Sequence, residues 1–266
     1  MTSLSNSELR DLYDQQVRRN TTPDQSGAMV DAGPTFVRWA AQDGLGWSEV
    51  FWTSLNESSA DEAIAAHIEF YRSRGLSFMW SVHDYDVPRD LGTRLLRAGF
   101  VEAGASTVMI AESARIADDP VLPEETQLVH IRDAEGVDQL IAVHESVFAH
   151  DQQDLRRSLR RRLQVAPHEM DMFIVTANGV PISSSRIEYL AASEFAALWG
   201  GSTEPQWRGR GLYRAQISRR AQLAAERGYR YLMVLASENS RPILTGLGFD
   251  AIAHVSRYHW KIGDES

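Results

Sequence analysis

The chain has 266 residues, no cysteine and a formal net charge of −9 at neutral pH, with 43% hydrophobic and 24% charged residues. This composition is typical of a globular protein with one large or two ordinary domains, and it excludes disulfides, thiolate metal sites and a cysteine nucleophile. The acidic balance argues against nucleic-acid binding and favours a cationic small molecule or peptide as partner.

No apolar run approaches the roughly 18 residues that a membrane span needs, and residues 1–19 are polar and charged. We therefore expect a cytoplasmic protein that binds no membrane. The sequence also predicts no metal site. It leaves the oligomeric state open between a monomer and a homodimer.

Periodicity and punctuation predict an alternation of helices and strands. Helices are expected at residues 5–19 (capped by Ser7), 59–74, 88–98, 135–149, 151–164, 212–227 and 240–247. Strands are expected at residues 35–40, 49–54, 76–82, 107–111, 127–131, 172–177, 180–189, 195–203, 230–236 and 251–260. Residues 21–33 and 44–46 are predicted as a loop and a turn, and Asn178-Gly179 as a hairpin.

A closing pattern occurs twice. Leu95 to Phe100 and Leu244 to Phe249 both end in Gly-Phe before a strand, at an offset of 149 residues (248 minus 99). Residues 119–125, rich in proline and acidic residues, interrupt all periodicity between the two occurrences. We therefore expect an α/β protein with a first domain at 1–118, a linker at 119–125 and a second domain at 126–266.

One loop carries the strongest chemical signal. Gln206-Trp207-Arg208-Gly209-Arg210-Gly211-Leu212 follows a predicted strand and precedes a predicted helix. Its glycines allow a tight turn with close backbone approach, and the helix start adds unpaired N–H groups and a partial positive charge. The loop therefore predicts an anion cradle, and its spacing matches neither a nucleotide triphosphatase loop nor a complete dinucleotide fingerprint.

These residues resemble the acetyl-coenzyme A loop of the GCN5-related N-acetyltransferases. The resemblance covers residues 126–260 well and residues 35–112 in outline. It implies two tandem folds of this family, each a mixed sheet flanked by helices, of which the N-terminal copy is degenerate. It also implies direct transfer of an acetyl group from acetyl-CoA to a primary amine of a small molecule, amino acid or peptide.

The resemblance implies a set of cofactor-binding residues. The strand backbone would contact the pantetheine and acetyl groups, and the loop amides would contact the pyrophosphate. The implied residues are Gly201, Ser202, Thr203, Arg208, Gly209, Arg210, Gly211 and Leu212, with Ser237 and Asn239 near the pantetheine arm. The arginine run at residues 156–162 is interpreted as a solvated helix face, with a phosphate contact as the alternative.

The candidate catalytic residues match the pattern of the family less closely than the loop does. Glu194 is the preferred general base, with Glu188, His83 and Asp84 as alternatives. Many members of the family carry a tyrosine acid on the last short helix, where this chain has Leu244; Tyr258 is our candidate replacement and Tyr213 the alternative. The missing acid motivates a second hypothesis, a non-catalytic acyl-CoA-binding or regulatory protein.

Overall fold

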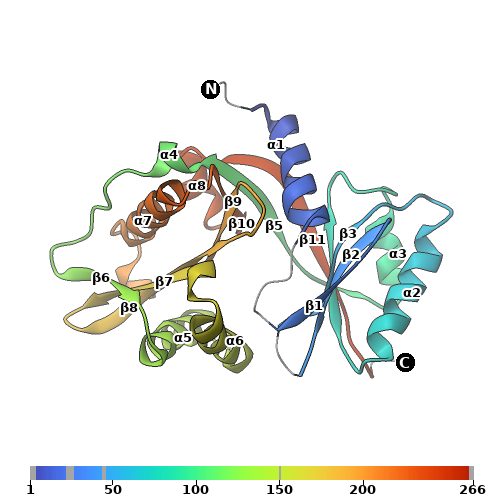
Figure 1. Ribbon diagram of the computed structural model, residues 1–266, viewed down its shortest axis with the longest axis horizontal. Coiled ribbons are helices and arrows are strands. Elements are labelled where there is room, and N and C mark those ends of the chain that lie inside the picture. The colour runs from blue at the N-terminus through green and yellow to red at the C-terminus, as the bar shows by residue number, and fades with distance from the viewer. Residues whose placement is uncertain (1–3, 22–26, 44–45, 150, 264–266) are drawn as a thin grey trace. The chain divides into compact units, whose positions relative to one another are not determined.

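The computed structural model describes residues 4–21, 27–43, 46–149 and 151–263 (Figure 1). The chain divides into two compact units. Unit 1 comprises residues 1–108, 236–238 and 251–266, and unit 2 comprises residues 109–235 and 239–250. This division differs from the predicted boundaries at 118 and 126, because the last strand of the chain is part of the sheet of unit 1.

Unit 1 is a mixed sheet with the strand order β1-β2-β3-β4-β11-β5. Its strands are β1 (Ala28–Gly33), β2 (Phe36–Ala41), β3 (Glu49–Thr53), β4 (Phe78–His83), β11 (Asp250–Trp260) and the first part of β5 (Val101–Glu112). Its helices are α1 (Asn6–Tyr13), the π-helical turn η1 (Asp14–Arg19), α2 (Ala60–Arg72) and α3 (Leu91–Arg97). The core includes Trp80, Tyr71, Tyr258 and Trp260, all buried.

Three local predictions in unit 1 need correction. Ala28–Gly33, predicted as part of a loop, is strand β1 and pairs with β2. The first helix is capped by Ser5 rather than Ser7, because Glu8 lies three residues after Ser5 and the two complete a capping box. That helix also passes into the π-helical turn η1. Residues 22–26 and 44–45, parts of the predicted loop and turn, lie outside the described residues.

Unit 2 is a mixed sheet with the order β5-β10-β9-β8-β7-β6, beginning with the last part of β5. Its strands are β6 (Thr126–Ile131), β7 (Met170–Ala177), β8 (Val180–Tyr189), β9 (Phe195–Thr203) and β10 (Tyr231–Ala236). Its helices are α4 (Ser113–Ile116), α5 (Ala134–Phe148), α6 (Gln153–Val165), α7 (Leu212–Glu226) and α8 (Arg241–Gly246), with 3-10 turns η2 (Pro167–Glu169) and η3 (Pro205–Trp207).

Helices cover both faces of the sheet in unit 2, with α7 on one face and α5 and α6 on the other (Figure 1). The Asn178-Gly179 hairpin is confirmed: β7 and β8 pair antiparallel around it, and both turn residues have positive φ. The predicted α/β class, a mixed sheet flanked by helices, is also confirmed.

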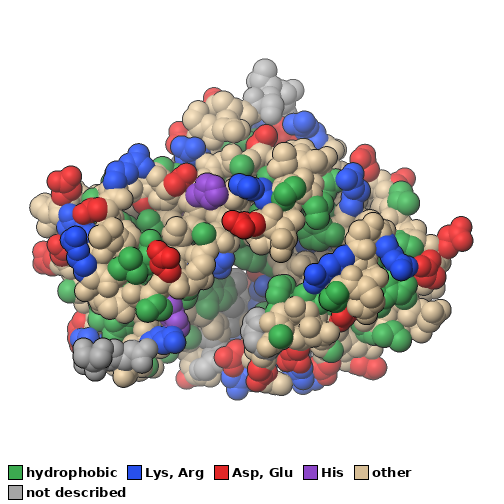
Figure 2. All heavy atoms as spheres, turned by 180° about the vertical axis from the view of Figure 1, so that it is seen from behind, with side chains coloured by type: hydrophobic (Ala, Val, Ile, Leu, Met, Phe, Trp, Pro, Cys, Tyr) green, Lys and Arg blue, Asp and Glu red, His purple; other side chains and the backbone are tan. Residues whose placement is uncertain are grey.

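On the face shown in Figure 2, acidic and basic side chains are interspersed, so the described residues present no wide area of one charge there. Among the described residues, no helix has the length and hydropathy to span a bilayer. The same residues contain no group of three or more histidine or acidic side chains that could hold a metal ion.

Candidate active site

The candidate site of unit 2 lies where two parallel strands separate. Strands β9 and β10 pair in parallel from Phe195–Tyr231 to Ala197–Met233, and the pairing ends there. Strand β9 continues for six more residues, to Thr203, and then enters the glycine loop. The backbone of β9 beyond Ala197 therefore loses its β10 partner in the direction of the loop.

The loop has the conformation of an anion cradle. Gly209 and Gly211 have φ of +75° and +84°, a region that favours glycine, and Gly211 is the N-cap of α7. The first helical bond of α7 runs from Ala215 N–H to the Gly211 carbonyl. Within the described residues, the N–H groups of Gly209, Arg210, Gly211 and Leu212 have no acceptor in the chain.

Arg208 departs from this pattern. Its N–H donates to the Pro205 carbonyl at 3.3 Å, so the unpaired amides begin one residue later than the resemblance implied. Its side chain turns back to the Thr203 carbonyl at 3.0 Å, and the Arg210 side chain lies 3.4 Å from Glu125 and over the Trp207 ring. The loop therefore offers backbone N–H groups more than guanidinium groups.

The side chains of Ser202 and Thr203 are engaged within the protein. Ser202 Oγ lies 2.7 Å from Ser184 Oγ, and Thr203 Oγ1 lies 2.7 Å from Ser183 Oγ, which also accepts from Gln216. Gly201, by contrast, is exposed and has no side chain. A contact with a ligand along this part of β9 would therefore use the backbone.

Tyr213 stands beside this stretch of β9. A Cβ added to Gly201 would lie 2.7 Å from Tyr213 Cε2, so the glycine makes room for the ring. The Tyr213 hydroxyl is hydrogen-bonded to Ser240, the residue before α8, next to Asn239. Burial raises the pKa of the Tyr213 phenol, although Arg220 and Ser240 oppose this shift, so the phenol is protonated at neutral pH.

The candidate bases Glu194 and Glu188 are not at the opening. Glu194 precedes the paired end of β9, seven residues before Gly201, which is roughly 23 Å along an extended strand. Its carboxylate lies 3.9 Å from Arg230. Burial raises the pKa of Glu188, but Arg162 and Arg186 outweigh burial and hold that pKa below its usual range, so Glu188 is an ion-pair member rather than a proton acceptor.

Other predicted residues belong to unit 1. Tyr258 is buried in its core, and its hydroxyl fills the space that a Cβ on Gly92 would occupy. His83 is buried with Nε2 3.3 Å from the Tyr13 hydroxyl, and burial, with Arg18, keeps its pKa well below the usual value. Asp84 is exposed, and Ser237 follows β10 in a short segment grouped with unit 1. Leu244, where the tyrosine acid was expected, is fully buried in unit 2.

The arginine run of α6 is a face of ion pairs. Arg156 contacts Glu145, Arg160 contacts Asp138, and Arg162 contacts Glu188 at 3.1 Å. Arg157, Arg160 and Arg161 are exposed, as the solvated-face interpretation predicts, but Arg162 is buried, so the interpretation is wrong for that residue. The contacts give no support to a phosphate contact.

Unit 1 also has two parallel strands that separate after a short paired stretch, but its own side chains bind the backbone groups there. Its strands β3 and β4 pair in parallel only at Glu49–Met79 and Val50–Trp80, with α2 between them in sequence. The next carbonyl of β3, Phe51, accepts a bond of 3.3 Å from Nε of fully buried Arg18. Before α2, Asn56 Oδ1 accepts from the N–H groups of Ser58 and Ser59. The groups that are unpaired in unit 2 are thus occupied here.

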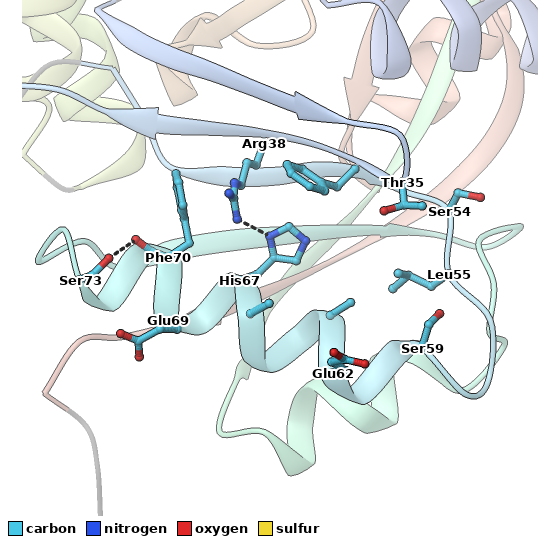
Figure 3. Close-up of a pocket in the computed structure, with 13 residues that line it drawn as sticks. Thr35, Arg38, Ser54, Leu55, Ser59, Glu62, His67, Glu69, Phe70 and Ser73 are labelled. Carbon is cyan, nitrogen blue, oxygen red and sulfur yellow. Dashed lines mark hydrogen bonds between the residues drawn. The ribbon is translucent and has the colours of Figure 1, made fainter.

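A separate pocket of about 590 Å³ runs along α2 in unit 1 (Figure 3). In it, Arg38 pairs with Asp31 at 2.6 Å, lies 3.3 Å from the centre of the Phe70 ring and donates to His67 Nδ1 at 3.1 Å. Burial, and then Arg38, lowers the pKa of His67 to about 3, so the imidazole is neutral and accepts. Because Arg38 and His67 bind each other, they stabilise the packing of α2 on the sheet.

The strand order, the parting of β9 from β10 and the glycine loop belong to a fold that this chain shares with solved GCN5-related N-acetyltransferases. The chain is similar to a solved GCN5-related N-acetyltransferase from Kribbella flavida, with 13% identity and a TM-score of 0.67 over 96% of this chain and 95% of that chain. No family model and no curated protein matches the sequence.

Two further solved structures share the fold. A tandem GNAT protein from the clavulanic acid biosynthesis pathway has 14% identity and a TM-score of 0.61, over 93% of this chain and 86% of that chain. A GCN5-related N-acetyltransferase from Sphaerobacter thermophilus has 15% identity and a TM-score of 0.59, over 87% and 82%. The predicted resemblance in fold is thus confirmed.

Proposed function

We propose that the protein is an N-acetyltransferase that moves an acetyl group from acetyl-CoA to a primary amine. The observation that carries the proposal is the run of unpaired N–H groups at Gly209 to Leu212, placed where β9 parts from β10. Unpaired amides at a helix N-terminus favour phosphate groups. The pyrophosphate of coenzyme A would lie on this run, and the thioester along the β9 backbone beyond Ala197, which has no β10 partner.

The chemistry asks little of the protein beyond positioning. Alignment of the amine with the thioester can supply roughly 7 to 11 kcal/mol. A lysine-like amine gives up its proton at neutral pH at a cost of about 4 to 5 kcal/mol, so solvent can serve as the base. This route does not require Glu194, which lies at the other end of β9.

We assign the role of general acid, which protonates the leaving thiolate of coenzyme A, to Tyr213 in place of Tyr258. Its protonated phenol lies between the free stretch of β9 at Gly201 and the start of α8 at Ser240. When the carbon–sulfur bond breaks, the tetrahedral intermediate releases the amide and a thiolate, and the phenol donates its proton to the sulfur. The acceptor remains a small molecule, amino acid or peptide amine.

The test has two parts. Calorimetry with acetyl-CoA measures binding, and incubation with acetyl-CoA and a panel of amines, read by release of free thiol, measures transfer. Binding with transfer to one or more amines supports the proposal. Absence of binding at millimolar acetyl-CoA contradicts it.

A non-catalytic acyl-CoA-binding or regulatory protein is the second candidate, favoured by buried Leu244 at the position of the family's usual acid. Tight acetyl-CoA binding with no turnover on any amine would support this function instead.

Replacing Gly211 by alanine is expected to weaken acetyl-CoA binding by roughly 10-fold, because a side chain in the left-handed region costs about 1–2 kcal/mol and shifts the amides at the start of α7. Gly228 is the matched control, since it follows the other end of α7 with φ of +82° and open space around its Cβ. Both variants should lose similar stability in thermal denaturation. Equal cofactor affinity in the two variants would argue against the cradle.

Replacing Tyr213 by phenylalanine is expected to lower kcat about 10- to 100-fold with little change in KM, since the ring stays and only the proton donor is lost. The deficit should shrink above about pH 8.5, where a thiolate leaves without protonation. Tyr258→Phe is the comparison, with kcat expected near the wild-type value. A kcat of Tyr213→Phe equal to wild type at pH 7 would remove Tyr213 from the mechanism.

A further inference from the structure

Arg220 on α7 is a buried cation without a counter-ion. The residue is 1% exposed, and within the described part of the chain no carboxylate pairs with it. Burial lowers the pKa of its guanidinium to about 10, with Tyr213 opposing this shift and Arg186 adding to it, so the group is still charged at neutral pH. Burying a charge without a counter-ion costs desolvation free energy. We therefore expect Arg220 to have a structural or functional role that offsets this cost.

The guanidinium is bound by backbone carbonyls. Its Nε donates to the Gln216 carbonyl at 2.9 Å, within α7. Its Nη1 donates to the carbonyl of Arg186 on β8 at 3.0 Å and to that of Trp199 on β9 at 3.5 Å. Arg220 therefore ties α7 to two neighbouring strands at one level of the sheet.

At the position where Arg220 binds the two strands, β9 contains a β-bulge. In the β8–β9 ladder, Arg186 lies opposite Trp199, and the next pair is Ser184 with Ser202. Gly200 and Gly201 therefore face the single residue between Ser184 and Arg186, and Gly200 has a φ of +61°. A bulge bends its strand and increases the local twist. Here it follows closely on Ala197, the last residue of β9 that pairs with β10.

The opposite face of the sheet holds the same bulge. Nε2 of His144, on α5, lies 2.9 Å from the Gly200 carbonyl. A Cβ on Gly200 would stand 2.8 Å from this nitrogen and 2.9 Å from Arg186 Nη1, so the packing requires glycine. Successive carbonyls of β9, at Trp199 and Gly200, are thus bound from α7 and from α5.

We propose that Arg220 and His144 are positioning residues that hold the bulge of β9 and thereby set the part of β9 beyond Ala197, unpaired with β10, along which the acyl thioester is aligned. This inference rests on the proposed function for its ligand, but the clamp itself is a property of the chain. The Arg220 cation also opposes the rise in the pKa of the Tyr213 phenol that burial causes.

The experiment compares Arg220→Met and Arg220→Lys with Arg219→Met. Arg219 is the matched control, because it is the arginine directly before Arg220 on α7 and is only partly buried. Its Nη1 donates to Gln222 Oε1 at 3.2 Å. Backbone hydrogen exchange of residues 199–203, read by mass spectrometry without cofactor, reports on the bulge. Calorimetry with acetyl-CoA, together with KM and kcat, reports on alignment.

Arg220→Met should speed exchange at residues 199–203 and raise the Kd and KM for acetyl-CoA about 10-fold or more, since hydrogen bonds from a charged donor are lost. Arg220→Lys should fall between, and Arg219→Met should match wild type. If Arg220→Met does not fold, the same measurements on Arg220→Lys and His144→Gln test whether these residues hold the bulge. A folded Arg220 variant with wild-type exchange and a Kd within about twofold of wild type overturns the inference.

The two proposals fail differently. If the wild-type protein does not bind acetyl-CoA, the proposed function is contradicted, while hydrogen exchange in the variants still decides whether Arg220 holds the bulge. If the wild type binds acetyl-CoA and the Arg220 variants bind it equally well, only the positioning role is lost.

Discussion

A chain that ends at Asp250 is expected to lose the cooperative folding of unit 1. Strand β11 contributes six paired positions to β4, from Val255 opposite His83 to Trp260 opposite Phe78. Its side chains at Ile252, Val255, Tyr258 and Trp260 are buried. At about 1.5 to 3 kcal/mol for each buried apolar side chain, their loss removes roughly 6 to 12 kcal/mol. That is comparable with the whole stability of an ordinary domain.

Circular dichroism, thermal melting and limited proteolysis measure this effect. A chain ending at Gly263 is the control, because it keeps β11 entire. The single substitution Trp260→Ala should reproduce part of the loss, about 3 to 5 kcal/mol, because it leaves a cavity beside Phe78. A chain ending at Asp250 that melts like wild type would contradict the assignment of β11 to unit 1. A fragment of residues 126–266 would carry β11 without its partner β4.

Replacing Arg18 by methionine is expected to destabilise unit 1 by about 3 to 5 kcal/mol, because it removes the cation from a buried ion-pair network. Arg18 is fully buried and bonds Asp86 through both terminal nitrogens, at 3.0 and 2.8 Å, and Asp14 at 2.6 Å. Methionine keeps much of the apolar stem but leaves the Asp86 carboxylate buried without its main partner.

Arg19→Met is the matched control. Arg19 is the next residue, its side chain is 52% exposed, and it lies 3.7 Å from the same Asp14. An exposed pair contributes about 0 to 1 kcal/mol, so the control should stay within that range. Urea denaturation followed by tryptophan fluorescence gives both values. Equal stability of the two variants would refute the structural role of Arg18 in unit 1.

The Arg18 network also bears on how many cofactors one chain binds. In unit 1 the carbonyl after the last β3–β4 pair is held by Arg18, and the amides before α2 are held by Asn56. In unit 2 the corresponding loop amides are unpaired. The proposed function therefore places one acetyl-CoA on each chain, at unit 2, and the stoichiometry measured by calorimetry tests this number directly.

Local sequence determined the parts of this protein that depend on neighbouring residues. Gly209 and Gly211 before an apolar-periodic helix predicted a turn with exposed amides, because only glycine adopts those positive φ values readily. Asn178-Gly179 predicted its hairpin because asparagine and glycine both tolerate the positive φ that the turn requires. Four of the five loop amides named from sequence are unpaired; Arg208 is bonded because the 3-10 turn before it supplies the Pro205 carbonyl.

Tertiary structure decided what depends on distant partners. Arg219 and Arg220 are adjacent residues of the same type, yet only Arg220 is buried and contacts the β8–β9 bulge. The reason is that an α-helix turns by about 100° per residue, so the two side chains point in different directions. Glu194, expected at the start of the strand before the loop, lies just before the paired end of β9, which only the β9–β10 register reveals. Strand β11 joins unit 1 because pairing with β4 buries Tyr258 and Trp260, and periodicity along a strand does not specify its partner.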